Sequence, residues 1–102
     1  MRSYVAIWEF RGNPEFSADF EKAYGPDGDW ARLFGRANGY LGTELLRDRD
    51  DHNRYITADY WQSRESYDAF QAGFAEEYAA VDAKFAAYSD QERLIGHFDA
   101  VE

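Results

Sequence analysis

The sequence contains no cysteine among its 102 residues. Disulfides, thiolate nucleophiles and thiolate metal sites are therefore excluded. Histidine is also scarce: only His52 and His97 are present, and neither has a second ligand at the spacing that a metal site requires. No apolar run approaches the ~20 residues that a membrane-spanning helix needs. These absences predict a protein without a metal site and without a membrane segment.

Basic residues are few relative to acidic ones. The chain has 11 lysine and arginine residues against 20 aspartate and glutamate residues, which gives a formal charge of −9. Such a surface repels phosphate groups, so neither nucleic acid nor an anionic membrane is an expected partner. The first ten residues alternate like a strand and lack the apolar centre of a signal peptide. We therefore expect a cytoplasmic location.

Apolar and aromatic residues, in contrast, are plentiful. Hydrophobic residues make up 45% of the chain and aromatic residues 19%. A chain of this length forms one domain, here residues 1–102, with a substantial core. So many large rings predict a bulky core, an aromatic pocket or a large subunit interface.

The stretch from residue 54 to residue 70 carries the clearest structural signal. Residues 54–61 alternate with the period of two that a half-buried strand requires. Ser63 follows as a helix N-cap, because its hydroxyl can accept a hydrogen bond from a free backbone N–H of the first turn. Apolar residues then recur every three or four positions from Tyr67 to Tyr88. This spacing predicts a helix over residues 64–88, with a bend or break at Gly73.

The remaining segments complete a β-α-α-β-β-α-β order. The other predicted strands and helices cover residues 3–11, 40–48 and 92–101, and residues 15–24 and 30–37. Residues 25–29 separate the first two helices, because they include one proline and two glycines. The order predicts a ferredoxin-like α+β fold, a four-stranded antiparallel sheet with helices on one face. The other face would stay exposed in a monomer, so we expect a homodimer formed through the sheet.

A polar turn between residues 47 and 54 predicts an antiparallel hairpin. If Arg47 faces Arg54, then Glu44 and Asp59 lie on the same sheet face, although a bulge in the turn would shift this register by one residue. A carboxylate buried among aromatic rings has a raised pKa and can act as a general base. The alternative is that each carboxylate pairs with an arginine at the rim. The pattern leaves open which sheet face meets the helices.

Three residues are therefore candidates for catalysis: Asp59, Glu44 and His97. The last strand holds His97, as either a structural residue or a pocket acid/base, whereas His52 lies in an exposed turn. Aromatic rings in strands and helices could line a flat pocket, or could equally form an ordinary core. The candidate substrate-binding residues are Trp8, Phe10, Tyr55, Trp61, Phe70 and Tyr78. We expect a closed pocket of at least ~300 Å³ that contains one or more of the catalytic candidates.

Two passages of the sequence resemble a known family. Residues 39–48, GYLGTELLRD, and the passage YWQSRESY that begins at Tyr60 are similar to the antibiotic biosynthesis monooxygenase superfamily. The resemblance covers nearly the whole chain and implies a dimeric α+β barrel, in which two such sheets close into one barrel. The haem-degrading branch has Asn, Trp and His at positions that correspond to about Phe10, Phe70 and Tyr78, so the resemblance does not imply a haem cofactor. The interruption at residues 25–29 departs from the commonest family pattern.

The resemblance implies a cofactor-independent monooxygenase, or a related small-molecule enzyme, for an aromatic or quinone-like substrate held between sheet and helices. No cofactor is expected. Two alternatives belong to other classes. One is a non-catalytic module for ligand binding or dimerisation, and the other is a cofactor-free isomerase or lyase of a small polar metabolite. Oxygen consumption separates the first function from both alternatives.

Overall fold

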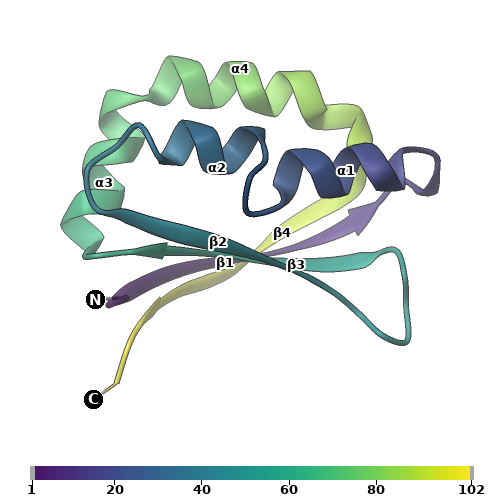
Figure 1. The fold of residues 1–102 in the computed structure, drawn as a ribbon, viewed down its shortest axis with the longest axis horizontal. Coiled ribbons are helices and arrows are strands. Elements are labelled where there is room, and N and C mark those ends of the chain that lie inside the picture. The colour runs from purple at the N-terminus through teal and green to yellow at the C-terminus, as the bar shows by residue number, and fades with distance from the viewer. Residues whose placement is uncertain (1, 102) are drawn as a thin grey trace.

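All the helices of the protein lie on one face of a single four-stranded sheet (Figure 1). The computed structural model describes residues 2–101. In chain order the elements are β1 (Tyr4–Gly12), the short 3-10 helix η1 (Pro14–Phe16), α1 (Ser17–Tyr24), α2 (Asp29–Phe34), β2 (Tyr40–Arg47), β3 (Arg54–Trp61), α3 (Arg64–Gly73), α4 (Ala75–Phe85), the 3-10 helix η2 (Ala86–Tyr88) and β4 (Ser89–Asp99). The predicted α+β fold is confirmed.

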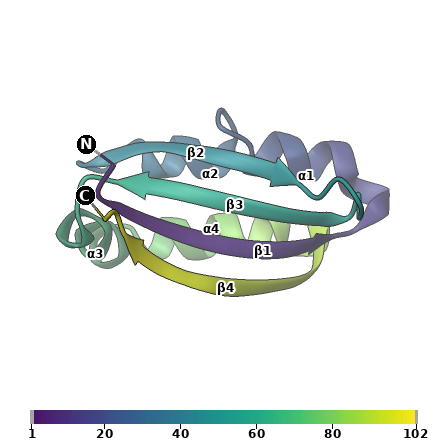
Figure 2. The same ribbon diagram turned by 90° about the horizontal axis from the view of Figure 1, so that it is seen from below.

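The sheet has the strand order β2-β3-β1-β4, and every neighbouring pair is antiparallel. Figure 2 shows these strands side by side from the face that carries no helix, with the helices behind them. We call the face that meets the helices the inner face and the opposite one the outer face. Within residues 2–101, no helix has the length and apolar character needed to cross a membrane.

Local sequence signals account for the helix boundaries. The Ser63 side chain accepts a hydrogen bond from the backbone N–H of Ser66 at 3.1 Å, as expected for an N-cap. Pro14 begins the first helical turn, where a missing N–H is harmless. The long helix predicted from residue 64 is broken beside Gly73, because Phe74 leaves the helical conformation with φ −121° and ψ 26°. The result is two helices, α3 and α4.

The interruption between α1 and α2 has a steric cause. A Cβ atom at Gly28 would collide with the backbone carbonyl oxygen of Ala23, so a side chain cannot be accommodated there. Gly28 also occupies the N-cap position of α2, and no side chain caps this helix. The tight turn matters for the site because it places Trp30, in the first turn of α2, over the sheet.

The hairpin between β2 and β3 has a different register from the predicted one. Asp48, and not Arg47, lies opposite Arg54, since the Asp48 backbone N–H donates to the Arg54 carbonyl oxygen at 2.9 Å. Arg47 consequently pairs with Tyr55. The connecting loop then holds an odd number of residues where an even number was predicted. Because side chains alternate along a strand, this one-residue shift moves the side chains from Thr43 to Arg47 to the other face relative to β3, whereas Tyr40, beyond a bulge, still lies opposite Trp61.

The shift separates the two carboxylates that were expected to share a face. Asp59 lies opposite Thr43, whereas Glu44 lies opposite Ala58. Asp59 therefore points to the inner face and Glu44 to the outer face, where it accepts a hydrogen bond from the Tyr60 hydroxyl. The prediction that Glu44 and Asp59 lie together is wrong.

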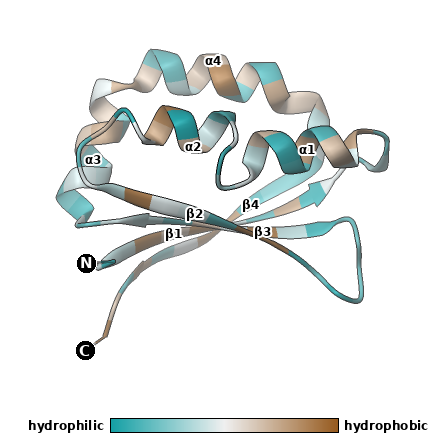
Figure 3. Cartoon of the chain, in the orientation of Figure 1, coloured by the Kyte–Doolittle hydropathy of each residue, from teal (hydrophilic) through white to brown (hydrophobic). Residues whose placement is uncertain are grey.

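Aromatic rings fill the space between the inner face and the helices. The largest fully buried side chains are Trp61, Tyr55, Phe20 and Phe70. Figure 3 shows hydrophobic segments along the strands, whereas the loop that joins β2 to β3 is hydrophilic. The outer face is different, because Leu46 and Phe98 remain 52% and 45% exposed there.

Two glycines are expected to respond in opposite directions to alanine. Gly39 has φ +90°, and a Cβ atom there would lie 2.6 Å from the Ser66 Cβ atom. Gly39→Ala should therefore lower the free energy of unfolding by about 1–3 kcal/mol. Gly73 ends α3 with no neighbour near its would-be Cβ atom, so Gly73→Ala should raise it by up to about 1 kcal/mol. Urea unfolding measures both, and equal effects of the two substitutions would contradict this account.

Candidate active site

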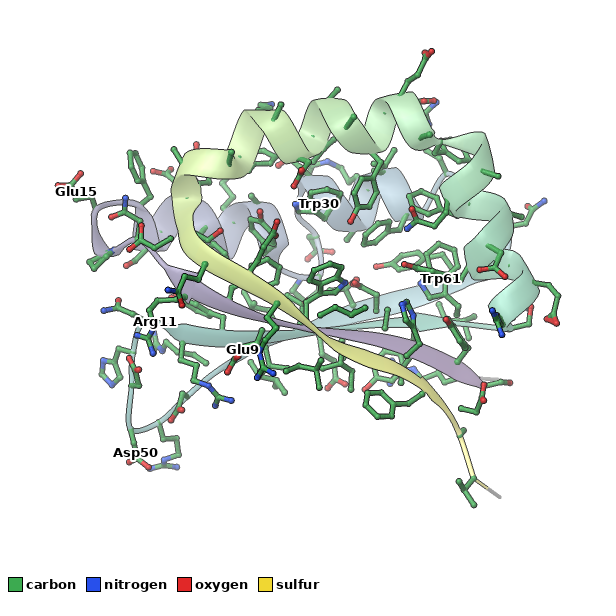
Figure 4. All side chains as sticks on the ribbon, turned by 180° about the vertical axis from the view of Figure 1, so that it is seen from behind. Glu9, Arg11, Glu15, Trp30, Asp50 and Trp61 are labelled. Atoms are coloured by element: carbon green, nitrogen blue, oxygen red, sulfur yellow. The ribbon has the colours of Figure 1, made fainter. Side chains whose placement is uncertain are left out.

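A cavity of about 230 Å³ lies between the inner sheet face and helices α1, α2 and α4. Figure 4 shows Trp30 between the helix layer and the sheet. The lining residues come from all of these elements and from every strand: Trp8, Phe10, Tyr24, Trp30, Phe34, Thr43, Thr57, Asp59, Tyr78, Asp82 and Glu92. The cavity is partly open to solvent and smaller than ~300 Å³, so the prediction of a closed pocket of that size is wrong. Its volume suits a molecule of one or two rings.

Asp59 forms the polar floor of this cavity. It is 8% exposed and lies near the middle of β3, opposite the small side chain of Ala6. The Thr43 hydroxyl donates to Asp59 Oδ1 at 2.6 Å. Because this uses the only proton of Thr43, the Tyr40 hydroxyl acts as donor to Thr43 Oγ1, also at 2.6 Å. A hydrogen-bonded row of hydroxyl groups therefore supports the carboxylate from β2.

The protonation state of Asp59 is sensitive to pH near neutrality. Burial raises the pKa of Asp59 to about 6, and the hydrogen bond from Thr43 opposes this rise. No arginine or lysine within residues 2–101 forms an ion pair with it. A carboxyl group of this kind is mostly ionised at neutral pH, and its raised pKa makes it a stronger base towards a proton of a ligand.

Aromatic rings fix the walls of the cavity. The Trp30 ring meets the Tyr78 ring edge to face at 4.8 Å between centroids, and Phe10 meets Tyr24 in the same way at 5.0 Å. Trp30 is only 7% exposed, and its Nε1–H donates no hydrogen bond to the described part of the chain. Burial raises the pKa of Tyr24 to about 12, although the nearby Trp30 side chain acts in the opposite direction. The walls thus combine flat apolar surface with a buried indole N–H that lies beside the Tyr24 hydroxyl.

Carboxylates from two other elements line the same cavity. Asp82 lies on α4, one helical turn after Tyr78, and Glu92 lies on β4 opposite Phe10. Both residues are exposed, but partial burial of the Glu92 carboxyl group raises its pKa, and the negative charge of Asp82 adds to this rise. Burial also raises the pKa of Tyr78, and the charges of Asp82 and Glu92 add to this rise. The two carboxylates are thus close to each other and to the aromatic walls.

The structure divides the sequence-predicted candidates into two groups. Asp59, Trp8, Phe10 and Tyr78 line the cavity. Tyr55, Trp61 and Phe70 are instead buried in the core beside it, and the Tyr55 hydroxyl donates to Glu21 Oε2 at 2.6 Å.

His97 and Glu44 lie outside the cavity. The His97 ring contacts the rings of Tyr4 and Tyr67, with centroids 5.6 and 5.0 Å apart, and the residue is exposed to solvent. Glu44 lies on the outer face. The arrangement therefore leaves Asp59 as the one catalytic candidate that lines the cavity.

Seven cavity residues are absent from the sequence-predicted candidates: Tyr24, Trp30, Phe34, Thr43, Thr57, Asp82 and Glu92. Two signals were available in the sequence. Thr57 precedes Asp59 by two positions on a strand, and Asp82 follows Tyr78 by four positions on a helix, so each pair shares a face. The position of Thr43 in the cavity could not be predicted, because it depends on the hairpin register.

Within residues 2–101, no group of three or more acidic or histidine side chains could hold a metal ion.

The hydrogen bond from Thr43 should control the pKa of Asp59. Thr43→Val keeps the side-chain shape and removes the hydroxyl that stabilises the ionised carboxylate. We expect the pKa of Asp59 to rise further in this variant and to stay near its original value in Thr43→Ser. NMR titration of the Asp59 carboxyl carbon measures both. An unchanged pKa in Thr43→Val would show that the hydrogen bond has no influence on the carboxylate.

Comparisons with known proteins agree with this fold. A family model for antibiotic biosynthesis monooxygenase matches residues 3–84. SnoaB, a cofactor-independent oxygenase from Streptomyces nogalater, is 26% identical over 98% of this chain and 92% of its own, with a TM-score of 0.60. A protein of Bordetella bronchiseptica named for the same family is 19% identical over the whole of both chains, with a TM-score of 0.75. No match was found among curated proteins.

Proposed function

Because the chain belongs to the antibiotic biosynthesis monooxygenase family, we propose that it is a cofactor-independent monooxygenase for a small aromatic substrate. The observation that carries this proposal is the buried carboxyl group of Asp59, which lies without an ion pair at the floor of an aromatic cavity. The likeness to the oxygenase SnoaB supports the same reaction class. The size of the cavity favours a phenol or naphthol with one or two rings.

In the proposed reaction, Asp59 removes the proton of the phenolic hydroxyl. The resulting phenolate carries negative charge on a ring carbon, and this carbon transfers an electron to O₂ and then bonds to it as a peroxide. Loss of the ring hydrogen and cleavage of the O–O bond leave a carbonyl group and release water. One oxygen atom enters the product and the other becomes water. The substrate supplies all four electrons, so no external reductant is required.

Other cavity residues have supporting roles in this scheme. Thr43 orients the Asp59 carboxylate and, with Tyr40, forms a row of hydroxyl groups behind it. The aromatic walls keep water away from the carbanion-like intermediate, which would otherwise be reprotonated.

We also propose that the protein is a homodimer joined through the outer sheet face. Leu46 and Phe98 are exposed on this face, and a second copy would cover them. Light scattering at micromolar concentration tests this proposal, and the mass of a single chain contradicts it.

Oxygen uptake tests the proposed activity. We expect the purified protein to consume oxygen with at least one member of a panel of phenols, naphthols and hydroquinones, and to yield a quinone by mass spectrometry. Product formation under nitrogen would instead indicate an isomerase or lyase. Ligand binding without oxygen uptake or product would indicate a binding module. Either outcome overturns the monooxygenase assignment.

A further inference from the structure

The side of the cavity formed by α4 and β4, here called its entrance, carries carboxylates. A second hollow of about 200 Å³ adjoins it, shares Tyr24, Asp82 and Glu92 with the cavity and also includes Asp90. Among residues 2–101, neither hollow is lined by a lysine or an arginine. A ligand that enters along this path therefore passes carboxylates before it reaches the aromatic walls.

The carboxylates at the entrance lack counter-ions within the described part of the chain. Glu9 shows the usual arrangement, because it pairs with Arg54 at 2.6 Å and with Arg93 at 2.9 Å. Neither Asp82 nor Glu92 has such a partner in residues 2–101.

The nearest lysine in the sequence does not neutralise the entrance. Lys84 follows Asp82 on α4 by two positions, yet its ammonium group lies 3.7 Å from Asp29 and 5.2 Å from the centre of the Phe85 ring. The arginines that share a neighbouring hollow with Glu92 are Arg11, Arg54 and Arg93, and they pair with Asp51 and Glu9 instead.

The charge and the aromatic walls together are suited to a cation. Asp82 raises the pKa of Glu92, in addition to the effect of burial, so the two carboxylates repel each other and a positive group between them would relieve the repulsion. The rings of Tyr24, Trp30 and Tyr78 lie beside them and offer faces that attract cations. The net charge of −9 favours the approach of a cationic ligand over that of an anionic one.

We propose that the substrate is a phenol with an alkylamine side chain. Its ring enters the cavity, while its protonated amino group stays between Asp82 and Glu92. This inference rests on the proposed function for the position of the ring, with its hydroxyl towards Asp59. An aromatic carboxylate of the same shape is excluded by the same two side chains. Asp82 and Glu92 are thus specificity-determining residues.

Binding of three matched phenols tests the proposal without turnover. Tyramine, para-propylphenol and para-hydroxyphenylpropionate share a ring and a similar side chain, but are cationic, neutral and anionic. Trp8 and Trp30 line the cavity, whereas Trp61 does not. In two-dimensional NMR spectra, the indole N–H signals of Trp8 and Trp30 should shift with tyramine, while the Trp61 signal serves as an internal control.

Tyramine should bind about tenfold more tightly than the neutral phenol, and the anion should bind most weakly. Asp82→Asn combined with Glu92→Gln should abolish the preference. Glu15→Gln combined with Asp19→Asn removes the same charge from an exposed surface distant from Trp30 (Figure 4), and should preserve it. Added salt should weaken the preference of the unaltered protein.

Equal binding of all three phenols, or no shift of Trp8 and Trp30 with any of them, overturns the proposal. A preference for tyramine that survives the Asp82 and Glu92 substitutions also overturns it. Oxygen uptake with neutral phenols but no charge preference would contradict this inference alone. Selective tyramine binding without oxygen uptake would contradict the monooxygenase and retain the amine site.

Discussion

Replacing Asp59 with asparagine should make the protein more stable above neutral pH and remove the proposed oxygenase activity. The folded protein holds the Asp59 proton more tightly than the unfolded chain, because burial raises its pKa from 3.8 to about 6. The carboxyl group is therefore neutral in both states below about pH 4, and ionisation disfavours the fold as pH rises through about 4–6. Above this window the cost is about 3 kcal/mol, which Asp59→Asn should recover.

Urea unfolding at about pH 4 and about pH 8 measures this effect. Asp59→Asn and the unaltered protein should have similar stability at the lower pH, and the variant should be more stable at the higher one. Asp19→Asn is the control, because Asp19 is exposed and its loss should leave the pH dependence unchanged. A variant that is less stable at the higher pH, or equally stabilised at both, would contradict the raised pKa.

The same substitution removes the proposed base. General-base catalysis contributes about 10²–10⁴-fold to a rate, so oxygen uptake should fall by this factor. Asparagine keeps the side-chain shape and can still accept the hydrogen bond from Thr43, so the loss should appear mainly in kcat. An active Asp59→Asn variant would assign the base to another group. Gain of stability with loss of activity is the expected signature of a functional buried charge.

Trp61→Ala should cause the largest loss of stability in the chain. Trp61 is completely buried and packs against the rings of Tyr40 and Phe70, each with its centroid 5.3 Å away. Truncation of such a residue lowers the free energy of unfolding by about 3–5 kcal/mol, out of a total of about 5–15 kcal/mol that is usual for a domain. The variant should be marginally folded at room temperature.

Denaturant unfolding followed by circular dichroism measures this loss, and Trp8→Ala provides a matched control. Trp8 lines the cavity and is partly exposed, so its truncation should destabilise the fold much less. Trp61→Phe should also be mild, because it keeps an aromatic ring and removes an Nε1–H that has no partner within residues 2–101. Equal effects of Trp61→Ala and Trp8→Ala would show that Trp61 does not anchor the core.

Local patterns in the sequence determined the order and type of the elements. The alternation in residues 54–61, the cap at Ser63 and the break beside Gly73 each depend on neighbours a few positions away, and all of them appear in the structure. Boundaries were less accurate. β4 begins at Ser89, three residues before its predicted start, because its pairing with β1 continues to Gly12. Pairing between distant strands is not encoded in the local pattern.

Only the tertiary structure decided which side chains form the site. Glu44 and Asp59 looked equivalent in the sequence, and a loop with one more or one fewer residue decides whether they share a face. The structure places Asp59 on the cavity floor and Glu44 on the opposite face. Asp82 and Glu92 come together because α4 lies over β1 and β4 (Figure 2), and the local sequence pattern does not predict this packing. The elements follow from local periodicity, whereas the cavity and its charges follow from packing between segments that are far apart in the chain.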